Sequence, residues 1–107
     1  MPKYLFKSHY TAEGLEGLLK DGGTARRSVI EKSAADLGGS VESFYFAFGD
    51  DDVFCVVELP DNSAAAKISM VIGAAGRAHT TVVPLLTVDD VDRIAAGSMP
   101  SYTPPGG

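Results

Sequence analysis

Two histidines and a group of aspartates are the residues in this chain best suited to chemistry near neutral pH. His9 lies near the end of an extended, aromatic segment close to the N-terminus, and His79 lies near the start of a later β-branched segment. If these segments pair as antiparallel strands, His9 lies close to His79. Imidazoles beside a carboxylate can bind a divalent metal or transfer protons. The other candidates expected at this end of the sheet are Tyr10, Asp50, Asp51, Asp52 and Arg77.

No ligand spacing such as H-E-x-x-H fixes a metal site at these positions. His9 and His79 are therefore candidate metal ligands with a plain alternative, in which both are polar side chains at a solvated sheet end. The sequence names no cofactor and assigns no catalytic residue.

Glu58 is a carboxylate within an otherwise apolar strand segment. Such a residue is either paired, as with Lys7 on the adjacent strand, or part of a ligand pocket. Since a strand rises about 3.4 Å per residue, we expect Glu58 to lie more than roughly 10 Å from His9.

Two arginines follow a glycine-rich break between helical stretches. Gly22 and Gly23 precede Thr24, and Arg26 and Arg27 come directly after Ala25. Glycines, a hydroxyl and guanidinium groups at a helix start can hold a carboxylate or a phosphate. The alternative is an ordinary helix break followed by solvated arginines, because no G-x-x-x-x-G-K-[ST] phosphate loop is present.

Strand and helix signals alternate in the order βαββαβ, followed by one more helix. Thr11 and Thr24 are expected to cap the first two helical stretches, and Gly38 with Gly39 to end the second. Pro84 cannot donate a ladder hydrogen bond, so it places the last strand at a sheet edge. The expected strands are 4–10, 41–48, 52–59 and 77–83, with a tight hairpin at 49–51, and the later helices are 64–75 and 88–96.

This order predicts an α+β fold of the ferredoxin-like kind, with a four-stranded antiparallel sheet in spatial order 4-1-3-2 and helices on one face. Residues 1–96 form one domain, since 107 residues have room for a single core. Residues 97–107 contain three prolines and no apolar periodicity. We expect them to be a disordered tail, with an arm laid on a partner as the alternative.

One face of the predicted sheet is left without helices. An unbroken apolar row in strand 52–59, made of Val53, Cys55, Val57 and Leu59, suits the helix side. The open face then carries Phe54, Val56 and Glu58, with either Phe44, Phe46 and Phe48 or Val41, Tyr45 and Ala47 from strand 41–48. A partly apolar face with aromatics predicts a symmetric homodimer or a higher homo-oligomer, with a monomer of mildly apolar surface as the alternative.

Composition excludes several classes of protein. The formal net charge of -5, with nine basic residues scattered among fourteen acidic ones, argues against a nucleic-acid partner. No window approaches about 18 uninterrupted apolar residues, and no charged leader precedes an apolar run, so we expect a cytoplasmic protein without a membrane partner. The single Cys55 lies in an apolar segment and is interpreted as a core residue.

Several short motifs of the chain form a pattern typical of one family of bacterial proteins. They are Tyr4-Leu5-Phe6, Tyr10-Thr11 with Gly14, Arg26-Arg27, Leu37-Gly38-Gly39, Phe44-Tyr45-Phe46-Ala47-Phe48-Gly49 and Glu58-Leu59-Pro60-Asp61. Through these motifs the sequence resembles the GYD-domain family from about Tyr4 to Ile94. The family's Gly-x-Tyr-Asp signature corresponds to Gly49 through Asp52, with Asp51 in place of the tyrosine. The resemblance implies a ferredoxin-like fold of the dimeric α+β barrel group, and it implies no activity.

Two functional hypotheses follow. The first is a small enzyme or metabolite-binding protein whose cleft between sheet and helices holds an aromatic or carboxylate-bearing compound, with His9, His79 and the 50–52 turn as polar contacts. The second is a non-catalytic homodimeric interaction module, in which the open sheet face forms the interface.

Overall fold

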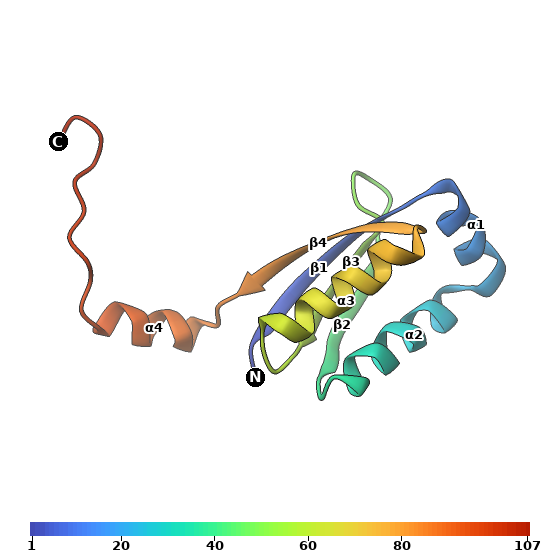
Figure 1. The fold of residues 1–107 in the computed structure, drawn as a ribbon, viewed down its shortest axis with the longest axis horizontal. Coiled ribbons are helices and arrows are strands. Elements are labelled where there is room, and N and C mark those ends of the chain that lie inside the picture. The colour runs from blue at the N-terminus through green and yellow to red at the C-terminus, as the bar shows by residue number, and fades with distance from the viewer.

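Four antiparallel strands form one sheet in the order β2-β3-β1-β4, as Figure 1 shows for the computed structural model, which describes residues 1–107. The α+β, ferredoxin-like fold and the predicted strand order are confirmed. The strands are β1 (Lys3–Tyr10), β2 (Ser40–Phe46), β3 (Val53–Glu58) and β4 (Ala78–Leu85). The helices are α1 (Ala12–Asp21), α2 (Gly23–Asp36), α3 (Asn62–Ala75) and α4 (Val88–Ala96).

Helices α2 and α3 lie on the same face of the sheet (Figure 1). Because side chains alternate along a strand, every second residue of β1 and β3 points toward these helices. In β3 and in the first half of β1 those residues are buried, and they meet a buried row from the two helices. Ser8 and Tyr10, further along β1, are half-buried. The core consists of Tyr4, Phe6, Ile30, Ala34, Cys55, Val57, Leu59, Ala64, Ala65 and Ile68.

Helix α1 starts as predicted, whereas the predicted cap of α2 is wrong. The Thr11 hydroxyl accepts a hydrogen bond from the Gly14 N–H at 3.2 Å. Helix α2 begins at Gly23, and its N-cap is Gly22 with φ 84°, without a side-chain cap. A positive φ favours glycine, which explains how the chain turns sharply between two helices here. Thr24 therefore lies inside the first turn of α2.

A β-bulge corrects the predicted faces of β2. The register shifts between Val41 and Ser43, so Val41 lies opposite Val57 while Tyr45 lies opposite Phe54. The extra residue places Val41 on the helix side and Tyr45 on the open side, so the two do not share a face. Phe44 packs against the core, and it makes an edge-to-face contact with Phe46 at 5.2 Å between ring centroids.

The loop between β2 and β3 is longer than predicted. Strand β2 ends at Phe46 instead of Phe48, and the Phe48 side chain is fully exposed. Asp52 anchors the return, because its N–H donates to Ser8 O and its carboxylate accepts from the Tyr10 N–H, both at 2.8 Å. The Ala47 N–H donates to Asp52 O at 2.8 Å, so the loop is closed across its two ends and held to β1 through Asp52.

The last helix lies outside the sheet and helix body. Helix α4 forms over the predicted residues and has a capping box between Thr87 and Asp90, yet none of its residues is buried. Figure 1 shows β4 leading away to α4 and the C-terminal end. Residues 97–107 contain no helix or strand. None of the four helices combines the length and the apolar character needed to cross a membrane.

Candidate functional site

A two-part cleft lies between the sheet and the helices. The inner part has a volume of about 30 Å³ and is bounded almost entirely by apolar side chains from β1, β2, β3, α2 and α3. The outer part has a volume of about 210 Å³ and lies between α1, α2 and the C-terminal end of α3. Both parts are lined by Tyr10, Arg26, Ile72 and Ala78, which therefore stand at the passage between them.

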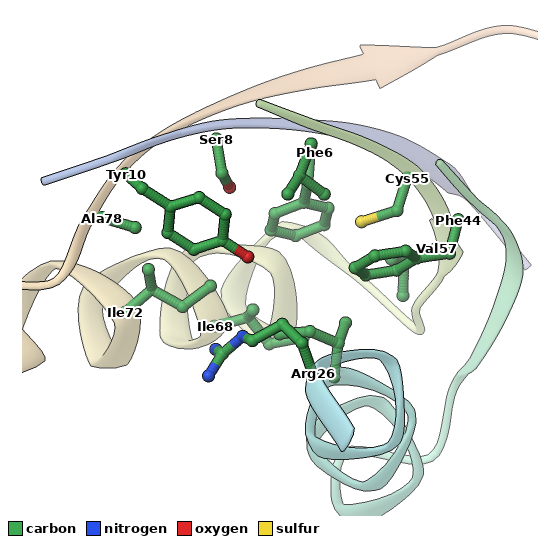
Figure 2. Close-up of a pocket in the computed structure, with 12 residues that line it drawn as sticks. Phe6, Ser8, Tyr10, Arg26, Phe44, Cys55, Val57, Ile68, Ile72 and Ala78 are labelled. Atoms are coloured by element: carbon green, nitrogen blue, oxygen red, sulfur yellow. The ribbon is translucent and has the colours of Figure 1, made fainter. Parts of the chain in front are cut away.

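Tyr10 and Arg26 place two polar groups at this passage. Figure 2 shows the Tyr10 hydroxyl pointing from β1 toward the helices, with the Arg26 side chain reaching from α2 into the same space. Arg26 is half-buried and forms no ion pair with any carboxylate of the chain. Neither the Tyr10 hydroxyl nor the Arg26 guanidinium makes a hydrogen bond to another protein group. Both groups are therefore free to bind solvent or a ligand in the cleft.

The surroundings of Tyr10 keep its hydroxyl protonated. Burial raises the pKa of Tyr10 above its usual value, because the phenolate would lose solvation. The Arg26 charge acts in the opposite direction, and Asp52 adds to the increase. At neutral pH the hydroxyl is thus a hydrogen-bond donor.

Helix α1 forms the outer wall of the cleft and comes unusually close to the backbone at the start of β4. Gly14 is buried, and a Cβ atom there would lie 2.0 Å from Arg77 O. The Thr11 N–H donates to the same oxygen at 3.0 Å. Two acidic side chains lie on this outer side: Glu13, which pairs with Arg77 at 3.4 Å, and Asp21. Glycine at position 14 thus lets α1 approach the start of β4.

His9 and His79 are brought together as the sequence suggested. They are direct partners in the β1–β4 register, and Asp52 Oδ2 lies 3.7 Å from His9 Nδ1. By strand alternation both imidazoles point to the open face of the sheet, whereas Tyr10 points to the helix side. The histidines therefore do not line the cleft, and Tyr10 does not belong to their group.

The remaining predicted residues at this end do not converge. Asp50 is exposed in the 47–52 loop, and Arg77 is bound by Glu13. No three His, Cys, Asp or Glu side chains of the chain come close enough together to hold a metal ion. The reason is geometric, since successive residues of β1 point to opposite faces of the sheet.

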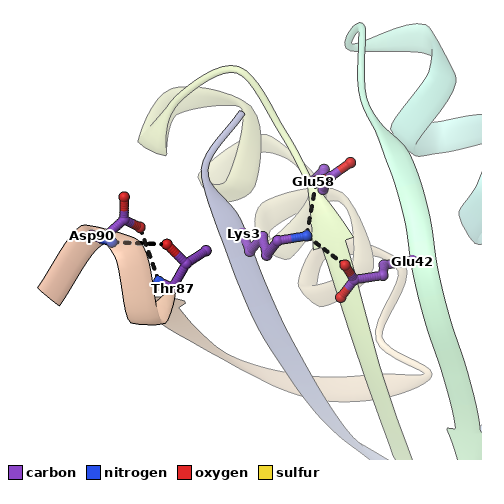
Figure 3. A network of polar contacts seen from close by, with 5 residues as sticks. All are labelled: Lys3, Glu42, Glu58, Thr87 and Asp90. Carbon is purple, nitrogen blue, oxygen red and sulfur yellow. Dashed lines mark hydrogen bonds and ion pairs between the residues drawn. The ribbon is translucent and has the colours of Figure 1, made fainter. Parts of the chain in front are cut away.

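Glu58 forms an ion pair, but its partner is not Lys7. The Lys3 ammonium donates to the Glu58 carboxylate at 2.9 Å and also pairs with Glu42. Figure 3 shows Lys3 between these two carboxylates. The register explains the error, because Lys3 lies opposite Glu58 while Lys7 lies opposite Phe54. The hydrogen bond from Lys3 lowers the pKa of Glu58, and the bonds to Glu42 and then Glu58 raise the pKa of Lys3. Glu58 is thus part of a surface ion-pair network on the open face.

The two adjacent arginines differ sharply. Arg27 is exposed, and its Nε lies 3.9 Å from Glu31 one helical turn later. Arg26 enters the cleft without a partner. Only one of the two predicted anion-binding residues therefore faces an enclosed space.

Sequence reasoning missed the apolar interior of the cleft. Phe6 and Phe44 come from the strands, and Ile68 and Ile72 come from one face of α3. The alternation in β1 was the usable signal, since it places Tyr10 on the same face as Tyr4 and Phe6. No pattern in the sequence indicates the gap between α2 and α3, because the distance between two helices depends on packing across the whole core.

Comparison with models of protein families gives a match over most of the chain. The family model described as the GYD domain matches residues 4–95 of the chain. No match was found among curated proteins or among solved structures.

Proposed function

Because this chain belongs to the GYD domain family, and that membership by itself assigns no reaction, we propose a function from the cleft: the protein binds a small organic molecule there. The ligand lies between the sheet and helices α1, α2 and α3. An enzymatic step on that ligand would rest on Tyr10 and Arg26, since the histidines lie on the other face of the sheet.

The observation that carries this proposal is the pair of unpartnered polar groups at the entrance to an apolar space. Protein interiors are normally close-packed, and their polar groups are normally hydrogen-bonded. The cleft departs from the first rule, and the Tyr10 hydroxyl and the Arg26 guanidinium lie at its passage without a protein partner. No side-chain polar atom of the chain is fully buried without a partner, so both groups are open to whatever fills the cleft. A cavity with an apolar lining and a few convergent polar groups is the usual form of a ligand site. Its small volume favours a ligand below drug size.

Blocking the outer cleft tests the proposal. Ala75 is exposed and lines the outer cleft, whereas its neighbour Ala74 is exposed and does not. We expect fragments detected by ligand-observed NMR to bind the native protein and Ala74→Trp alike. Ala75→Trp should weaken their binding by at least about tenfold, since bulk replaces part of the ligand volume. Equal binding to Ala75→Trp, or no fragment binding to the native protein, would contradict the proposal.

A second candidate function is the homodimeric interaction module, and the open face of the sheet favours it. Leu5, Val56 and Val83 are neighbours across β1, β3 and β4, and all three are half-buried. Phe54 extends this apolar row, and the exposed Tyr45 lies opposite Phe54 on β2. We propose that a second copy of the chain covers this face. The cleft and this interface use opposite faces, so the two functions are compatible.

A charge placed in the apolar row tests the interface. Val56→Asp should convert a dimer into a monomer in size-exclusion chromatography with light scattering, because an unpaired carboxylate would be buried between subunits. Val71→Asp is the control, since Val71 is 68% exposed on α3, on the helix side. A native protein that is monomeric at micromolar concentration, or a Val56→Asp variant that stays dimeric, would refute this interface.

A further inference from the structure

We propose that the ligand of the cleft is a small monocarboxylate with an aromatic or branched aliphatic body. Its carboxylate is held by the Arg26 guanidinium and the Tyr10 hydroxyl, and its body lies against the apolar mouth of the inner cleft. This inference rests on the proposed function of the cleft and names the class of ligand.

The charge of Arg26 is the first argument. The chain carries fourteen acidic and nine basic residues, yet Arg26 faces the cleft without an ion-pair partner. Arg27, one residue away on the surface, does have a carboxylate near it. A half-buried guanidinium is stabilised by an anion that fits its planar donors, and a carboxylate does so with two parallel hydrogen bonds.

Tyr10 supplies the second donor from the opposite wall. Its hydroxyl projects from β1 toward the helices, beside the space that Arg26 enters from α2 (Figure 2). An acceptor-only group between the two walls can therefore bind both residues at once. A neutral amide, which brings N–H donors of its own, matches two facing donors less well.

The inner cleft selects the body of the ligand. Ten of its twelve lining residues are hydrophobic, among them Phe6, Phe44 and Ile68. An apolar group gains free energy by leaving water for such a lining, whereas a second polar group would lose its solvation. The inner volume of about 30 Å³ is close to that of one water molecule, so only the edge of the body enters it and the rest lies in the outer part, whose volume is about 210 Å³.

The outer cleft argues for a single negative charge. Glu13, Asp21 and Arg77 line only the outer part, beyond the passage formed by Tyr10 and Arg26. Arg77 pairs with Glu13, which leaves Asp21 as the outer carboxylate without an ion-pair partner. A second carboxylate or a phosphate extending outward would face Asp21 and be repelled. The arrangement therefore fits one anionic group at the passage and apolar atoms inside.

Matched ligands of one shape test the charge requirement. Calorimetric titrations use phenylacetate, phenylacetamide and 2-phenylethylamine with the native protein, Arg26→Gln, Arg27→Gln and Tyr10→Phe. We expect phenylacetate to bind the native protein at least about tenfold more tightly than the amide, and the amine not to bind. Arg26→Gln should weaken phenylacetate binding by about 10- to 100-fold and leave amide binding unchanged. Tyr10→Phe should cost about 3- to 10-fold, and Arg27→Gln should stay within about twofold of native.

Several results would overturn the inference while leaving the proposed function intact. Equal binding of acid and amide, or tighter binding of the amine, would show that the cleft does not select an anion. Phenylacetate binding that Ala75→Trp abolishes but Arg26→Gln leaves unchanged would place the ligand in the cleft without the arginine. If none of the three compounds binds folded protein at 10 mM, on the order of the weakest measurable affinity, the carboxylate class is wrong, and the fragment screen decides separately whether the cleft binds anything.

Discussion

Replacing Gly14 by alanine is expected to destabilise the protein, although alanine is the better helix former. The added Cβ would lie 2.0 Å from Arg77 O and 3.1 Å from Tyr10 Cδ1. Because carbon atoms pack best at roughly 3.5 Å or more, α1 would have to move away from β4 by more than about 1 Å. Arg77 O is a backbone atom that also accepts hydrogen bonds from the Thr11 N–H and hydroxyl, so it cannot rotate aside.

The magnitude follows from these contacts. Overpacking usually costs about 1–3 kcal/mol of unfolding free energy, and a clash with backbone belongs at the upper end. The better helix propensity of alanine returns less than about 1 kcal/mol. We therefore expect a net loss of about 2 kcal/mol, which lowers the melting temperature by on the order of 10 °C in a domain of this size.

Gly17 provides the matched control for this prediction. It lies one turn further along α1, and a Cβ there would meet nothing within 4 Å. Gly17→Ala should therefore stabilise the protein by about 0.5–1 kcal/mol. Urea unfolding of both variants, followed by far-UV circular dichroism, measures the difference. A Gly14→Ala variant as stable as native protein would refute the close approach of α1 to β4, and a destabilised Gly17→Ala would refute the open space beside α1.

Three further predictions concern other parts of the chain. Burial raises the pKa of the Cys55 thiol to about 11, so the native protein should react with a thiol reagent at pH 8 roughly 100-fold more slowly than urea-unfolded protein; equal rates would contradict the buried position. The hydrogen bond from Lys3 lowers the pKa of Glu58 in the folded protein below its value in the unfolded chain. The stability that this ion pair adds is therefore present when the pH is above the unfolded-state pKa of Glu58, and it is lost as the pH falls through the folded-state pKa. The stability difference between native protein and Glu58→Gln should therefore shrink in urea titrations from pH 7 to about 3, and a difference that grows would reverse the sign; Glu16→Gln, which removes no ion pair, is the control. Truncation after Leu86 should change the melting temperature by less than about 3 °C, since α4 buries no residue, and a large loss in a thermal scan would show that α4 supports the body.

Most of the fold was predictable because its local signals agree with its global order. The apolar row of Val53, Cys55 and Val57 faces the helices as the period of two requires, and Pro84 lies in an edge strand. Errors arose where one residue changes the geometry. The bulge after Val41 separated two side chains that simple alternation would have placed together. A second error arose at the start of α2, where the positive φ of Gly22 makes this residue the N-cap in place of the predicted Thr24.

The candidate site was only partly predictable, for a different reason. Strand register follows from hairpin and edge signals, so the His9 and His79 pair could be foreseen. The direction of a side chain decides which groups it can contact. Tyr10 points to the helix side of the sheet and the two histidines point to the open side, so they cannot form one site. Which lysine pairs with Glu58 depends on the register between β1 and β3. The observed register places Lys3 opposite Glu58, whereas pairing with Lys7 would need a shift of four residues along β1. A cleft between sheet and helices was part of the first hypothesis, but its size and lining depend on the distance between helices, which no local pattern encodes.

The central claim is that Arg26 receives the ligand inside the cleft, and NMR can observe that group directly. In ¹⁵N-labelled protein titrated with phenylacetate, the Nε–Hε signal of Arg26 should move and saturate together with backbone signals of the residues that line the cleft. The corresponding signal of Arg27 should stay in place. An Arg26 signal that remains fixed at saturating phenylacetate, or shifts confined to exposed lysines and to Arg27, would contradict the account.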